Sequence, residues 1–176
     1  RKRRVPEGLP LNKEQGKIPP QAPDLEEAVL GALMIEQKAV NEVIDVLTPD
    51  SFYREAHRKI YQAIFDLFDR AEPIDIMTVT AELRKSGDLD LVGGAYYISY
   101  LTNRVASSAN IQTHARIISQ KHILRELIRI SSDVIREAYD ESTDVFDLLD
   151  KAETDLFSVA QGNIRKEWDS LADVMK

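Results

Sequence analysis

The sequence predicts an all-α fold, and three observations carry this prediction. Only 7 of the 176 residues are glycine and only 7 are proline, fewer than a strand-and-turn architecture uses. Apolar residues recur at the three- and four-residue spacing of an amphipathic helix in one segment after another, and no segment alternates strictly over the length of a strand. The hydrophobic share of 43% and the charged share of 30% exclude collagen, mucins and wholly disordered chains.

The first half of the chain is predicted to form a group of short helices. The first begins at residues 23–24 and carries acidic residues in its first turn, where the helix dipole favours them. A short second helix stops at Thr48-Pro49, because the residue before a proline is pushed out of the α region. The next three helices are expected over Phe52–Ala71, from the cap Asp75 to a stop at Ser86-Gly87, and from the Gly93-Gly94 turn to Val105.

The second half is predicted to form an antiparallel helical hairpin. Residues 111–139 contain neither proline nor glycine and have apolar residues at helical spacing, which predicts one helix of roughly 40 Å. After a turn, a return helix capped by Asp144 is expected to run to a stop at Gly162-Asn163. The predicted organisation is a disordered basic tail (1–22), a compact helical subdomain (23–109), a protruding helical hairpin (110–161), and a linker with the start of a linker helix (162–176).

The charge is unevenly distributed. Residues 1–20 hold six basic and two acidic side chains, so the rest of a chain with a net charge of -7 carries a charge of -11. An acidic body is not typical of a surface that grips duplex DNA. A signal peptide would require an apolar region after the basic start, and none follows it. No run approaches the roughly 18 apolar residues of a membrane span. No membrane partner is therefore expected.

The inventory of chemically active residues is small. The absence of cysteine excludes disulfides, iron–sulfur clusters and thiol nucleophiles. Among the three histidines, only His122 has an acidic residue at helical spacing, Glu126, and such a pair is common by chance. His57 lies in an aromatic stripe, which favours hydrogen-bonded packing over catalysis. Gly16-Lys17 lacks the upstream glycine of a phosphate-binding loop. We therefore expect no catalytic residue, no cofactor and no metal, and no hydrolysis of ATP by this chain.

The hairpin has more apolar surface than one return helix can cover. Either it folds back onto residues 23–105, or its excess face is buried against another chain. The candidate interface residues are Ile128, Val134, Ile135, Leu148 and Leu149. Beyond the linker, a further apolar stripe predicts a detached docking helix. It is formed by Trp168, Leu171, Val174 and Met175.

Five stretches of the sequence stand out in order: DLEEAVLGAL (24–33), DSFYREAHRKIY (50–61), PIDIMTV (73–79), VGGAYY (92–97) and SANI (108–111). Together they resemble the signature stretches of the N-terminal domain of DnaB-type replicative DNA helicases. The resemblance covers about residues 20–160, and residues 168–176 resemble the start of the family's linker helix. The chain departs from the family in its longer basic tail and in lacking the RecA-like motor that normally follows. It is therefore expected to be a fragment of a longer protein.

The resemblance implies a collar in DNA replication. In this family the motor domain binds ATP and single-stranded DNA, while the N-terminal domains pair through the hairpin. The resulting trimer of dimers forms a hexameric collar that receives primase, and the linker helix docks on the adjacent motor domain. ATP and magnesium are thus implied only for the parent ATP-dependent helicase. The implied partners are other copies of the chain, primase, single-stranded DNA through the parent ring and, less directly, a helicase loader. The implied location is the bacterial cytoplasm, at the nucleoid and replisome.

Two other functions stay open at this point. A small helical hydrolase would use His57 with acidic neighbours, and would show turnover and a bound metal. A free-standing adaptor of the same fold would have no motor.

Overall fold

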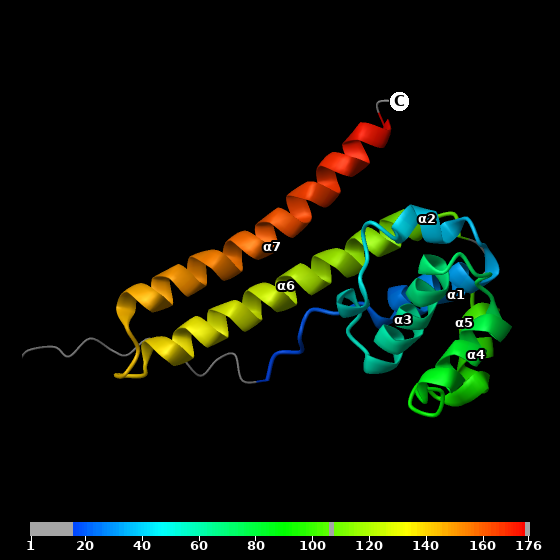
Figure 1. The fold of residues 1–176 in the computed structure, drawn as a ribbon, viewed down its shortest axis with the longest axis horizontal. Helices are drawn as coiled ribbons and strands as arrows, with labels where there is room; N and C mark the ends of the chain where they lie inside the picture. Colours follow the sequence, from blue (N-terminus) through cyan, green and yellow to red (C-terminus); the bar gives the residue numbers. More distant parts are fainter. Residues whose placement is uncertain (1–15, 106–107, 175–176) are drawn as a thin grey trace, which may run out of the picture.

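Helix α6 (Ile111–Ala138) belongs both to a bundle of shorter helices and to a hairpin of two long helices (Figure 1). Its first half packs into a bundle of shorter helices, and its second half extends away from them and pairs with α7 (Val145–Val174). The computed structural model describes residues 16–105 and 108–174, with the side chains of these ranges up to residue 162. All regular structure within those ranges is helical, which confirms the predicted fold class. The bundle consists of α1 (Pro23–Ile35), α2 (Ala39–Val43), the 3₁₀ helix η1 (Pro49–Ser51), α3 (Glu55–Asp69), α4 (Ile76–Ser86) and α5 (Gly94–Asn103).

The hydrophobic core lies between α1 and the helices that surround it. Helix α1 packs against α3, α5 and α6, so most of its circumference is buried. Helix α6 contributes Ile111, Ala115 and Ile118, which share one face at helical spacing. The first half of α6 therefore does pack on the subdomain. The largest fully buried side chains are Tyr61, Phe52, Leu30, Leu33, Leu47, Ile60, Ile64, Leu67, Leu83, Ile98, Leu101 and Ile118.

Helix α4 begins and ends where the sequence predicts. The Asp75 carboxylate accepts hydrogen bonds from the main-chain N–H groups of Met77 and Thr78, at 2.8 and 2.9 Å. The Thr78 hydroxyl accepts from the Asp75 N–H at 2.9 Å, which completes a reciprocal cap. At the other end Gly87 has φ +81°, a left-handed conformation that glycine adopts without steric cost.

The predicted helix over Phe52–Ala71 is too long at its start. The chain stays extended at Phe52 and Arg54, and α3 begins only at Glu55. Phe52 is nevertheless fully buried, with its ring centroid 4.8 Å from that of Tyr61. The extended backbone leaves the N–H of Tyr53 free to donate to Glu26. Core packing and this hydrogen bond therefore outweigh the helical periodicity of the sequence.

The predicted helix stop at Gly162-Asn163 is wrong. Gly162 does not adopt the left-handed conformation of a terminating glycine, and α7 continues to Val174. A glycine inside a helix costs only about 1 kcal/mol relative to alanine, which a long helix tolerates. The backbones of Trp168 and Leu171 thus lie on the same helix as the hairpin. Their side chains and that of Val174 lie outside the described residues, and so does Met175 altogether.

Two glycine substitutions test this packing in opposite directions. A Cβ on Gly31 would collide with the Leu101 carbonyl oxygen and with Cγ2 of Val105, because α1 and α5 approach closely there. Gly31→Ala is expected to lower the free energy of unfolding by about 1–3 kcal/mol in urea titrations. A Cβ on Gly162 would meet no atom within 4 Å. Gly162→Ala is expected to stabilise α7 by roughly 0.5–1 kcal/mol, seen as a higher midpoint of helix melting. Equal stability of the Gly31→Ala variant and the wild type would contradict the close α1–α5 contact.

Candidate interaction surface

The two long helices of the hairpin face each other along a narrow strip. On α7 the half-buried positions recur at intervals of four and three residues, as expected for the side turned toward α6. They are Leu148, Ala152, Asp155 and Val159. On α6, Ile130 is buried and Val134 is half-buried on the corresponding face. An ion pair between Lys151 and Glu137 joins the helices near the turn.

The other faces of the hairpin expose large apolar side chains. Phe146 is 76% exposed and Phe157 is 60% exposed; they are 11 residues apart, so they lie on the same side of α7. A soluble monomer seldom leaves so many large apolar side chains in water on one pair of helices, and such exposure is typical of a contact with another molecule. The exposed set on the hairpin comprises Leu124, Leu127, Ile128, Ile135, Tyr139, Val145, Phe146, Leu149, Leu156 and Phe157. We call this set the apolar hairpin face.

Ion pairs border the apolar hairpin face on α6. Arg129 pairs with Glu126 at 3.0 Å and with Asp133 at 3.3 Å, one turn away on either side. Arg136 also pairs with Asp133, at 2.8 Å. Exposed pairs of this kind add little stability, but they place a stripe of charged groups beside the apolar residues of α6. An apolar centre with a polar rim is the usual composition of a protein–protein interface.

The subdomain contains a separate, buried polar cluster around His57. The His57 ring is fully buried, and its Nδ1 lies 2.6 Å from the Glu26 carboxylate. Its Nε2 lies 2.8 Å from the Tyr97 hydroxyl. Glu26 also accepts a hydrogen bond of 2.7 Å from the Tyr53 N–H. Both ring nitrogens are therefore occupied inside the core, which confirms the predicted packing role and leaves neither nitrogen for a substrate.

A second carboxylate extends this cluster to the surface. Glu27 accepts hydrogen bonds from Arg54 at 3.1 Å and from Arg104 at 2.7 Å. These contacts tie the start of α3 and the end of α5 to the N-terminal half of α1. Within the described part of the chain, no group of three histidine or acidic side chains could hold a metal ion.

The sequence profile of the DnaB-like helicase N-terminal domain matches residues 18–120. The chain belongs to this family. The replicative DNA helicase DnaB of Rhodothermus marinus is 43% identical over 166 residues, which are 94% of this chain and 18% of that protein. The chain thus spans less than a fifth of that relative.

Two solved structures resemble this DnaB-like domain in fold. The N-terminal domain of DnaB helicase from Mycobacterium tuberculosis matches with a TM-score of 0.76 and 37% identity, over 80% of this chain and 99% of that one. A structure of a DnaB-like replicative helicase and its interactions with primase matches with a TM-score of 0.67 and 25% identity. That match covers 80% of this chain and 31% of the other. These matches confirm the predicted family and fold.

The predicted interface residues of this DnaB-like domain lie on two different faces of the hairpin. Ile128, Ile135 and Leu149 lie on the apolar hairpin face, where they are 43% to 60% exposed. Val134 and Leu148 lie on the half-buried strip between α6 and α7. Their role in contacts between chains stays a prediction, as does that of the docking stripe at Trp168, Leu171, Val174 and Met175.

Sequence reasoning missed two aromatic members of the apolar hairpin face in this DnaB-like domain: Phe146, which is the most exposed of the set, and Phe157. Both could have been found by plotting α7 on a helical wheel. They fall outside the stripe of Leu148, Ala152 and Val159 that a return helix needs for pairing with α6.

None of the described helices has both the length and the apolar content that spanning a membrane requires.

The Glu26–His57 pair makes a testable contribution to stability. Burial acts to raise the pKa of Glu26, but the hydrogen bonds from His57 and from the Tyr53 N–H outweigh it and hold that pKa below its usual value. A lowered folded-state pKa means that the stabilisation is complete above the unfolded pKa of ~4.3 and is lost as the pH falls through the folded value.

Glu26→Gln is therefore expected to lower the free energy of unfolding at neutral pH by about 1–3 kcal/mol, because His57 loses a charged partner. The variant should also lose less stability than the wild type when urea titrations are repeated in acid, at about pH 3.5. Parallel pH profiles for the two proteins would contradict a stabilising carboxylate at this position.

Proposed function

We propose that this chain is the N-terminal collar domain of a replicative DNA helicase, in which it joins subunits and docks primase during DNA replication. The apolar hairpin face is the observation that carries the proposal. It provides an extended apolar surface on a rigid arm, away from the core that folds the subdomain. Burying that surface against other chains gives the arm a thermodynamic reason to associate.

Membership of the DnaB-like family supports the proposal, and so do the names of its relatives. The similar structure that includes interactions with primase is the basis for proposing primase as a partner. We further propose that subunits form dimers through the hairpin and that three dimers form a hexameric ring. A helicase loader is a further proposed partner, and the proposed location is the replisome in the bacterial cytoplasm.

The motor activity is proposed for the longer protein to which this chain corresponds. The chain covers only 18% of the R. marinus helicase, so the ATP-dependent unwinding of DNA is assigned to the rest of such a protein. ATP, magnesium and single-stranded DNA would bind there. The stripe of Trp168, Leu171, Val174 and Met175 is proposed to dock on a neighbouring motor domain. The continuous α7 helix would carry the backbones of Trp168, Leu171 and Val174 outward from the hairpin.

The paired substitution Ile128→Asn and Ile135→Asn tests this function. Both side chains are exposed, so the variant should keep the helical circular dichroism of the wild type. Each buried interface side chain that is lost weakens association by about 1–2 kcal/mol or more, so the pair should shift the oligomer toward the monomer. Light scattering after size-exclusion chromatography measures the assembly, and a pull-down measures binding of the cognate primase.

Met77→Asn provides the matched control. Met77 is an apolar residue, 81% exposed, but it lies on α4 and not on the hairpin. This variant should assemble and bind primase like the wild type. Unchanged assembly and primase binding in the hairpin variant would reject the apolar hairpin face, and the interface would then have to lie on the subdomain.

A further inference from the structure

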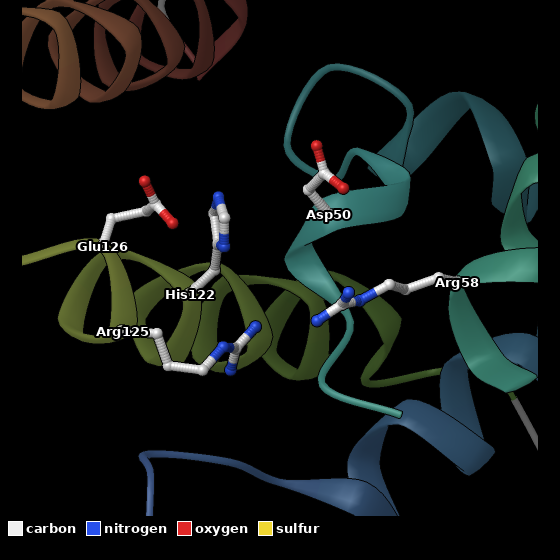
Figure 2. Close-up of a pocket in the computed structure, with 5 residues that line it drawn as sticks. All are labelled: Asp50, Arg58, His122, Arg125 and Glu126. Carbon is white, nitrogen blue, oxygen red and sulfur yellow. The ribbon is translucent and has the colours of Figure 1, made fainter. Parts of the chain in front are cut away.

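A small polar hollow lies where the subdomain meets α6, apart from the apolar hairpin face. Its volume is about 260 Å³, and it is lined by Asp50, Arg58, His122, Arg125 and Glu126. Figure 2 shows the guanidinium groups of Arg58 and Arg125 pointing toward one another, the first from α3 and the second from α6.

The two arginines are held in place by neutral groups. Arg58 donates from Nε to the Phe52 carbonyl at 2.8 Å and from Nη2 to the Tyr53 carbonyl at 3.4 Å. Arg125 donates to the carbonyls of Pro20 and Ser51, each at 2.8 Å. None of the ion pairs among the described residues includes either arginine, whereas Arg54, Arg70, Arg104, Arg129 and Arg136 all pair with carboxylates.

This arrangement leaves both hydrogen-bonding capacity and charge for a ligand. A guanidinium has five N–H donors, and the described hydrogen bonds use two on each arginine. Arg125 is half-buried and its guanidinium lies 5.6 Å from the centre of the Tyr53 ring, so its orientation is fixed before any ligand arrives. Holding two cations face to face without a direct carboxylate partner is unfavourable, and an anion between them would relieve the repulsion.

The charges around the hollow narrow the choice of ligand. Burial and the neighbouring Arg58 lower the pKa of Arg125, while the carboxylates of Glu26 and Glu126 act in the opposite direction. Glu26 is already engaged by His57 and by the Tyr53 N–H. Asp50 and Glu126 also line the hollow, so a bound anion must contact both guanidinium groups directly to outweigh the repulsion from these carboxylates. A compact oxyanion that contacts both guanidinium groups fits best, since planar arginine donors match the oxygens of a phosphate.

We propose that the hollow is a phosphate-binding site in which Arg58 and Arg125 hold the phosphate oxygens. The phosphate belongs either to a free ion or to the backbone of a single-stranded nucleic acid. The site binds without catalysis and is independent of the function proposed for the apolar hairpin face.

The test is a titration of the isotope-labelled chain, followed by NMR at the arginine side-chain signals. Inorganic phosphate is added in one arm and a ten-residue oligothymidylate in the other, each against potassium chloride at matched ionic strength. Saturable shifts at Arg58 and Arg125 with phosphate support a free-ion site, and tighter binding of the oligonucleotide identifies the backbone as the source. Shifts no larger than those caused by chloride, in both arms, would overturn the proposal.

Three variants make the result specific. Arg58→Gln should weaken binding about tenfold or more, because a charge-assisted hydrogen bond is lost; its circular dichroism checks the fold. Arg136→Gln is the matched control, because Arg136 also lies on α6 but is paired with Asp133, which does not line the hollow. It should bind like the wild type. Glu126→Gln should bind phosphate more tightly, since a repelling charge is removed. Weaker phosphate binding by Glu126→Gln would contradict an oxyanion site.

Discussion

The insertion of one end of α6 into the subdomain core is the constraint on which the rest of the structure depends. Ile111, Ala115 and Ile118 are buried there with the residues of α1, so the first turns of α6 cannot move independently of the bundle. Arg125 fixes the point where α6 leaves the bundle, because it bonds the carbonyls of Pro20 and Ser51. The remainder of α6 and the paired α7 extend from the bundle as an arm (Figure 1), and this arm carries the apolar hairpin face.

Two acidic residues of α1, Glu26 and Glu27, have structural roles in the subdomain. Glu26 occupies the buried His57, and Glu27 holds Arg54 and Arg104. These contacts join α1, α3 and α5. The polar cluster therefore organises the bundle, while association with other molecules is assigned to the hairpin and to the arginine hollow.

The sequence predicts those features that local chemistry determines. Asp75 caps α4 because a carboxylate can reach two main-chain N–H groups, and Gly87 ends it because glycine adopts a positive φ. Tertiary contacts decide the rest. Phe52 leaves the helical pattern to fill the core, and Gly162 continues a helix that local rules would end. Periodicity finds the apolar positions of the hairpin, but only packing against α6 separates half-buried Leu148 from exposed Leu149. The arginine hollow has no signal in the sequence, because its residues come from segments distant along the chain.

If other chains cover the apolar hairpin face, its residues are shielded from reagents in solution, and thiol labelling measures that shielding directly. The chain contains no cysteine, so Ile135→Cys and Met77→Cys each introduce a single reactive site. A thiol reagent is expected to modify the cysteine at position 135 more slowly as protein concentration rises, while position 77 reacts at one rate throughout. Equal and concentration-independent labelling rates at the two positions would show that the hairpin stays exposed, and would contradict the account.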